Sequence, residues 1–112
     1  MVDLPSEIVT GPYVYTVSSD PIRCKERSIG RDLFRAGETN HPELTVTVAS
    51  DLPDAQFKDT VLHEWLHTIW RTFHLPPEDD VKEEAIIKRL ATVLLDGMRR
   101  NPQLVAFLME AS

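Results

Sequence analysis

The segment VLHEWLHTIWRTFH, residues 61–74, decides how the rest of the chain is interpreted. Its apolar residues recur every three or four positions, which is the spacing of an amphipathic helix. The same segment carries His63 and His67 four residues apart, with Glu64 directly after the first histidine. It therefore predicts a helix with one apolar face and one face that carries reactive side chains.

The spacing of the two histidines suits a metal ion. Residues four apart on a helix lie about 40° apart around the axis and about 6 Å apart along it, so His63 and His67 can converge on one ion. Zinc binds imidazole nitrogen at about 2.0–2.1 Å, and a third protein ligand leaves a fourth position for water. Glu64 can take a proton from that water and deliver it to a leaving amine. We therefore expect a hydrolytic zinc site.

A third ligand is expected on the next helix, after the break at residues 75–77. Glu83 and Glu84 follow His67 by 16 and 17 residues. Glu83 lies over the centre of that helix's apolar stripe and Glu84 toward its flank, so spacing leaves both open. A carboxylate on an apolar face needs a charge or a metal to satisfy it. His74 is about 10.5 Å of helical rise beyond His67, too far to share an ion, and is expected to interact with the dipole at the helix C-terminus.

The flanking segments predict an α+β fold. Alternating β-branched and aromatic residues predict a small, mostly antiparallel sheet, with strands at 9–18, 32–36 and 44–49 and a turn at 37–42. Gly11-Pro12 interrupts the first of these, which is therefore expected to be an edge or bent strand. Helices are expected from a start near 51–54, where an aspartate cap and a first-turn proline favour initiation, from about 78, where Glu78, Asp79 and Asp80 occupy the first turn, and over 103–110. The chain is expected to form one domain over residues 1–112, strand-rich in 1–52 and helical in 53–112.

Composition narrows the classes of function. The 112 residues carry a net charge of −6 with scattered basic residues, which disfavours nucleic acid as a partner. No apolar run approaches the roughly 20 residues of a membrane span, and the N-terminus lacks a secretory signal pattern. Cys24 is the single cysteine, so no internal disulfide is possible. We expect a cytoplasmic protein that does not associate with membranes.

Three segments together resemble a known family. The strand LTVTVA at 44–49, the helix TVLHEWLHTIW at 60–70 and the helix EEAIIKRLATVLL at 83–95 are similar to gluzincin-type HExxH metallopeptidases. The similarity is greatest to the short minigluzincin forms that phages and prophages often encode, related to ImmA/IrrE-like proteins, and it covers about residues 44–102. It implies a minimal zincin fold, one zinc ion per chain, and a peptide or protein substrate.

The resemblance also implies roles for individual residues. Aligning Leu90-Ala91 with the aromatic-alanine pair of ImmA/IrrE-like proteins puts Glu84 on the ligand position, with Glu83 in reserve. His63 and His67 become the other two metal ligands, and Glu64 the catalytic general base. The strand at 44–49 is expected to be a sheet edge that binds extended substrate by strand addition.

The supporting residues of the site are less defined. Larger gluzincins often carry an aspartate four residues after the ligand glutamate, where this chain has Lys88. The histidines therefore need another orienting partner, for which Asp59 and Asp80 are candidates. Candidate donors to an oxyanion are Tyr13, Tyr15 and His41.

Three functions fit these patterns. The first is a zinc-dependent metallopeptidase in which Glu64 acts as general base. The alternative is a zinc-binding, catalytically weak or inactive protein-interaction module of the same fold. A third is a metal-free helical interaction protein that uses Trp65 and Trp70. The substitution Glu64→Gln separates the first two, since it abolishes hydrolysis only if Glu64 is the base.

Overall fold

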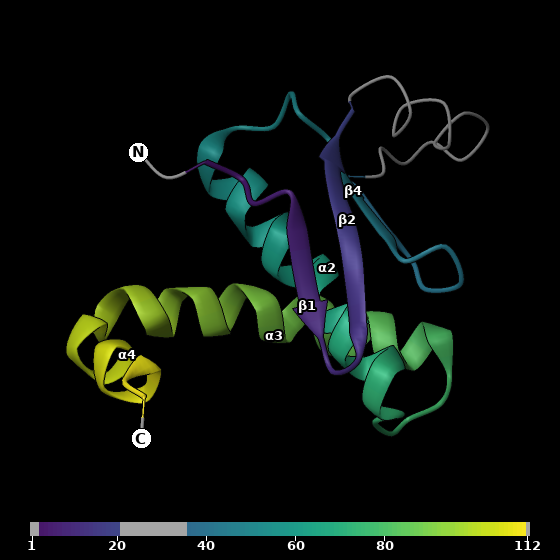
Figure 1. Ribbon diagram of the computed structural model, residues 1–112. Helices are drawn as coiled ribbons and strands as arrows, with labels where there is room; N and C mark the ends of the chain where they lie inside the picture. The colour runs from purple at the N-terminus through teal and green to yellow at the C-terminus, as the bar shows by residue number, and fades with distance from the viewer. Residues whose placement is uncertain (1–2, 21–35, 112) are drawn as a thin grey trace.

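The computed structural model describes residues 3–20 and 36–111, and it has the predicted α+β fold (Figure 1). A four-stranded sheet precedes three helices within these residues. The strands are β1 (Glu7–Thr10), β2 (Tyr13–Ser19), β3 (Gly37–Asn40) and β4 (Thr45–Val48). The helices are α2 (Asp54–Phe73), α3 (Asp80–Arg100) and the short α4 (Pro102–Met109).

The strand order of the sheet is β1-β2-β4-β3. β1 and β3 pair antiparallel with their neighbours, whereas β2 and β4 are parallel. The sheet is therefore mixed but mostly antiparallel, as predicted. The expectation that residues 44–49 form an edge is wrong, because β4 pairs with β2 on one side and with β3 on the other. Its residues Val46 to Ala49 are all buried, as is typical of an inner strand.

Three local predictions are also wrong. Residues 9–18 form two strands, since Gly11 adopts a positive φ of 56° and turns the chain into a hairpin. Residues 37–40, which belong to the predicted turn, form β3. Their backbone groups pair with those of β4, and this pairing outweighs the turn preference of their side chains. Helix α2 begins at Asp54, within the predicted start, but the predicted aspartate cap is wrong because Pro53 is the N-cap residue and no side chain caps the helix. The strand predicted at 32–36 lies outside the described residues except for Ala36.

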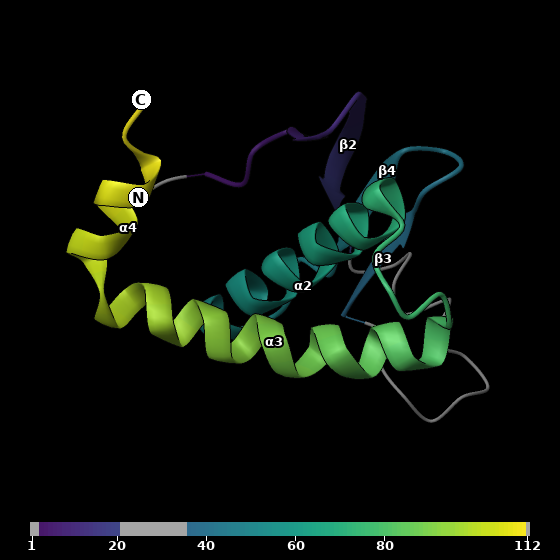
Figure 2. The same ribbon diagram turned by 90° about the horizontal axis from the view of Figure 1, so that it is seen from below.

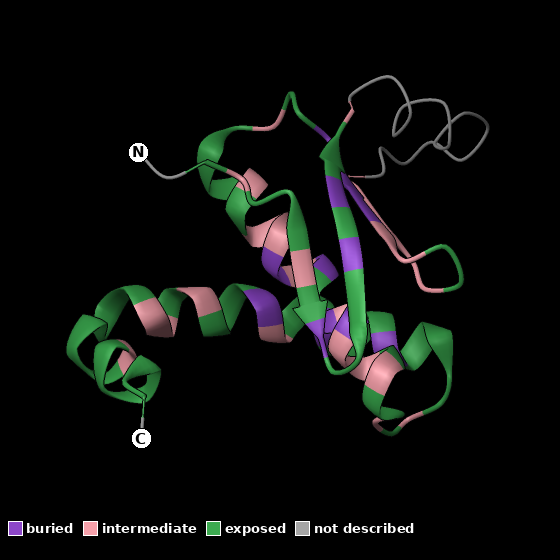
Figure 3. Ribbon diagram, viewed as in Figure 1, coloured by how far each residue is buried: buried purple, intermediate pink, exposed green. Residues whose placement is uncertain are grey.

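Helix α2 takes part in two clusters of buried apolar residues, and Figure 3 marks the buried positions along the ribbon. One face packs on the sheet, against a cluster formed by Tyr15, Val17, Val46 and Val48. The other face packs on α3, in a cluster formed by Leu62, Leu66, Ile87 and Ala91. The far end of α3 and all of α4 extend away from the sheet, and α4 has no buried residue. His63, Glu64 and His67 lie on α2, whereas Glu84 lies on α3.

The chain reverses between the end of α2 and the start of α3, so that α3 runs back along α2 (Figure 2). His74 caps the C-terminus of α2 in the left-handed conformation, so its place at the helix end is confirmed. Asp79 caps α3 by accepting hydrogen bonds from the backbone N–H groups of Val81 and Lys82. Among the helices described, none has both the length and the apolar character that crossing a membrane requires.

Candidate metal centre

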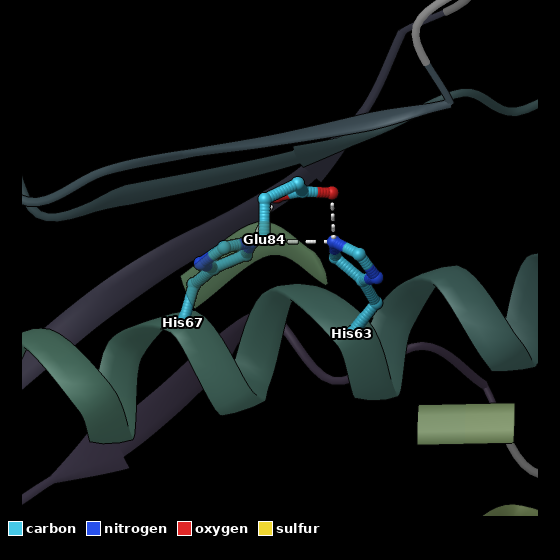
Figure 4. Close-up of side chains that lie close together, drawn as sticks. All are labelled: His63, His67 and Glu84. Atoms are coloured by element: carbon cyan, nitrogen blue, oxygen red, sulfur yellow. Dashed lines mark hydrogen bonds and ion pairs between the residues drawn. The ribbon is translucent and has the colours of Figure 1, made fainter. Parts of the chain in front are cut away.

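Two histidines of α2 and one glutamate of α3 point toward one another (Figure 4). The Nε2 atoms of His63 and His67 lie 3.2 Å apart. Glu84 places Oε1 2.9 Å from Nε2 of His63 and Oε2 2.7 Å from Nε2 of His67. One ligand atom from each residue fits within a group whose members all lie within 4.8 Å of one another. The three predicted ligands therefore meet at one point.

The spacing of these atoms fits a small tetrahedral ion. Ligand atoms at 2.0–2.1 Å from zinc in tetrahedral geometry are about 3.3 Å from each other. The 3.2 Å between the two imidazole nitrogens is close to that value. Two imidazoles and one carboxylate form a donor set typical of zinc sites that keep an open position. The residues present can hold zinc; their role as ligands stays a prediction.

The histidines and glutamates of the cluster stabilise one another's charged forms. Hydrogen bonds from His63 and His67 hold the pKa of the Glu84 carboxyl well below its ordinary range. Burial lowers the pKa of His67, but hydrogen bonds to Glu84 and Glu83 outweigh burial and raise it. The cluster thus favours an imidazolium beside carboxylates. A divalent cation binding here would displace that proton, so affinity should increase with pH.

Glu83 occupies a different place from Glu84. Its Oε2 lies 2.6 Å from Nδ1 of His67, the ring nitrogen opposite the one that faces Glu84. The Glu83 side chain is only 6% exposed, whereas that of Glu84 is 53% exposed. Arg71 contacts Glu83 through Nε at 3.4 Å. Glu83 therefore orients the ring of His67, with Nε2 turned toward Glu84 and His63.

The two aspartates suggested as orienting partners contact other residues. Asp80 accepts a hydrogen bond from Arg71 at 2.9 Å, and Asp59 accepts one from Thr92 at 3.3 Å. Neither makes a hydrogen bond to a site histidine in the described structure. Glu83 is instead the residue that contacts Nδ1 of His67. The sequence had pointed to it, because a carboxylate over an apolar stripe needs a charged or metal partner.

Glu64 faces the sheet side of α2 and is only 5% exposed. The hydroxyl of Thr39 on β3 donates to Glu64 Oε1 at 2.8 Å and also approaches the Glu64 carbonyl oxygen at 3.1 Å. Burial raises the pKa of Glu64, and the nearby imidazoles and the Thr39 hydroxyl lower it less. A raised carboxyl pKa suits a group that must accept and return a proton.

Strand β3 lies directly against the Glu64 side chain. A Cβ built on Gly37 would lie 2.8 Å from Cγ2 of Thr60 and 3.0 Å from both Cγ and Oε2 of Glu64. Only glycine lets the strand approach so closely. Sequence reasoning missed both Gly37 and Thr39, because the stretch GETNHP carries turn-type residues.

The candidate oxyanion donors form a separate cluster. The Tyr15 hydroxyl is hydrogen-bonded to Nδ1 of His41 and lies 3.5 Å from Oγ1 of Thr72, and the Tyr15 side chain is fully buried. Tyr13 packs its ring against the edge of His41. In the described contacts these side chains join β2 and the β3–β4 connection to α2, and none of them bonds to His63 or His67.

Comparisons with models of known families, with curated proteins and with solved structures give no match for this chain. No family is therefore shown. The resemblance to gluzincin-type metallopeptidases stays a prediction from the sequence.

Proposed function

We propose that this protein is a zinc-dependent metallopeptidase. His63, His67 and Glu84 hold the ion, and Glu64 is the general base. The observation that carries the proposal is the approach of Glu84 from α3 to both Nε2 atoms, at 2.9 and 2.7 Å, on a helix that also carries a buried glutamate. Zinc remains the proposed cofactor because of this donor set.

The residues divide the chemistry between them. A zinc ion held by His63, His67 and Glu84 would supply Lewis acidity and would lower the pKa of water at the site toward neutrality. Glu64 would take the proton from the attacking water and return it to the leaving amine. Glu83 holds the ring of His67 through Nδ1, so that Nε2 would be available to a bound ion.

The proposed substrate is an extended peptide. In the strand order of the described sheet β3 is the outermost strand, next to β4, so an extended peptide could add to the sheet beside it. β3 also contacts Glu64 through Thr39. A peptide on this edge would therefore lie beside the proposed base. β3 takes the role that the sequence had suggested for residues 44–49.

Metal content is the first test. Protein purified without a metal-affinity tag and measured by plasma mass spectrometry should contain about one zinc per chain, as expected for one three-ligand site. His63→Ala and Glu84→Ala should both lose it. His74→Asn is the matched control, because it removes a histidine of the same helix at a left-handed position that asparagine tolerates. Wild-type protein that takes up no added zinc contradicts the proposal.

Cleavage of a quenched fluorescent peptide library is the second test. Glu64→Gln should reduce hydrolysis by about 10²–10⁴-fold, the usual contribution of a general base, while zinc content stays at the wild-type level. Glu78→Gln is the control, since this glutamate precedes α3 and is exposed. Zinc binding without cleavage that depends on Glu64 would favour the alternative, a zinc-binding interaction module.

A further inference from the structure

The edge strand β3 presents two residues to α2 at the level of Glu64. Residues 37 and 39 lie on the same face of the strand, because side chains alternate along it. Thr39 donates a hydrogen bond to the Glu64 carboxylate, and Gly37 leaves room for it. We infer that Thr39 is a positioning residue that fixes the Glu64 carboxylate for its work as a base. The catalytic part of this inference rests on the proposed function.

A buried carboxylate needs a donor. Glu64 is 5% exposed, and an ionised group at that depth is unfavourable without hydrogen bonds. Thr39 Oγ1 is 2.8 Å from Oε1, a distance typical of a strong O–H···O bond to a carboxylate. The hydroxyl has one proton, and the shorter contact, to Oε1 rather than to the carbonyl oxygen at 3.1 Å, assigns it to the carboxylate.

The opposite carboxylate oxygen is constrained by the strand backbone. Oε2 of Glu64 lies 3.0 Å from where a Cβ of residue 37 would be. The carboxylate thus sits against β3 at Gly37 while it is hydrogen-bonded to Thr39. A glutamate has several rotatable bonds, and these two contacts select one arrangement among its rotamers. Preorganisation of this kind raises the rate of the chemical step rather than the affinity for substrate.

The structure supplies its own control four residues along α2. Thr68 donates a hydrogen bond to the Trp65 carbonyl oxygen at 2.6 Å, so the 2.8 Å contact between Thr10 and Thr68 is donated by Thr10. Thr10 lies on β1, at the other edge of the sheet. Thr10→Val therefore removes a strand-to-helix hydrogen bond of the same length that does not involve the proposed base.

The kinetic test compares Thr39→Val, Thr39→Ser and Thr10→Val in zinc-loaded protein, on the peptide that the wild type cleaves best. Thr39→Val should lower kcat about tenfold with unchanged KM and zinc content, the effect of losing one hydrogen bond to a charged group. Thr39→Ser restores the hydroxyl and should return kcat to near the wild-type value. Thr10→Val should leave kcat unchanged. Equal losses of kcat in Thr10→Val and Thr39→Val would overturn the inference.

A second measurement does not depend on activity. The side-chain resonances of Glu64 can be followed by NMR in protein labelled with ¹³C-glutamate and assigned with Glu64→Gln. They should shift in Thr39→Val and stay in place in Thr39→Ser and Thr10→Val. Unmoved Glu64 resonances in Thr39→Val would overturn the inference. Wild-type protein that cleaves no peptide would refute the proposed function, while this spectrum still decides whether Thr39 holds Glu64.

Discussion

The two edges of the sheet hold helix α2 by the same kind of contact, with different partners. At β1, the Thr10 hydroxyl bonds to Thr68 at 2.8 Å. At β3, the Thr39 hydroxyl bonds to Glu64 at the same distance. Glu64 and Thr68 are four residues apart and face the sheet on successive turns of α2. The contact at β1 joins two neutral hydroxyl groups, whereas the contact at β3 joins a hydroxyl group to an ionisable carboxylate.

The glycines repeat the comparison. A Cβ on Gly11, next to β1, would lie 3.0 Å from Cγ2 of Thr72. A Cβ on Gly37, in β3, would lie 2.8 Å from Cγ2 of Thr60 and 3.0 Å from Glu64. Both edges therefore need a close approach to α2. The comparison teaches that a strand-to-helix contact acquires a chemical role from the helix residue it reaches, not from the type of contact.

Among variants that keep Glu64, the largest effect is expected at His67, away from both edges of the sheet. Glu83→Ala should weaken zinc binding by about 10–100-fold, because His67 loses the carboxylate that orients it through Nδ1. Glu83→Gln keeps an acceptor and should weaken binding less. Competition with a chromophoric zinc chelator measures the affinity.

The Glu64 resonances should stay in place in Glu83→Gln. That result would sharpen the comparison, because it would show that Glu83 acts on His67 while the contact from β3 acts on Glu64. Wild-type zinc affinity in Glu83→Ala would show that this contact does not orient a ligand.

An intermediate effect is expected from the paired substitutions Gly11→Ala and Gly37→Ala. Gly11 has a positive φ of 56°, so alanine there should lower the free energy of unfolding by about 1–2 kcal/mol. It should leave kcat unchanged. Gly37→Ala should lower stability by about 1–3 kcal/mol through overpacking and should also lower kcat, because the new methyl group displaces Glu64. Urea unfolding and peptide cleavage measure the two quantities. A loss of kcat in Gly11→Ala as large as that in Gly37→Ala would break the comparison.

The smallest effect is a pH dependence of stability in metal-free protein. Burial raises the pKa of Glu64 above its ordinary 4.5, so the folded state binds this proton more tightly than the unfolded state. The resulting loss of stability is absent below pH 4.5 and develops as pH rises through the raised pKa. Glu64→Gln should therefore be more stable than the wild type at pH 7, with a difference that shrinks toward pH 4. Thr68→Val should show no such trend. A constant difference in urea unfolding across this range would contradict the explanation.

The helix with its histidine pair could be predicted from the sequence because both features are local. Apolar spacing defines the helix, and a four-residue separation brings His63 and His67 together at any helical site; their Nε2 atoms lie 3.2 Å apart. The α+β class follows from equally local alternation and periodicity. Which glutamate, Glu83 or Glu84, meets the two Nε2 atoms depended on how α2 and α3 cross. Adjacent residues point about 100° apart around a helix, and only that crossing sends Glu84 to Nε2 and Glu83 to Nδ1.

Strand β3 could not be predicted from the sequence. The contacts that β3 makes with Glu64, the proposed base, were therefore missed as well. Residues 37–40 have turn-type side chains, and they become a strand because β4 supplies hydrogen-bonding partners nearby in the fold. The order of strands is likewise set by long-range pairing, which placed β4 inside the sheet and β3 at its edge.

The sequence by itself determined which side chains could do chemistry, since the spacing on one helix is a property of the backbone. The tertiary structure decided which of them meet. It assigned Glu84 to the histidine pair, Glu83 to the far side of one ring, and Thr39 to the carboxylate of Glu64. These contacts join residues 16 to 25 positions apart, so their geometry depends on how whole elements pack and not on any local pattern.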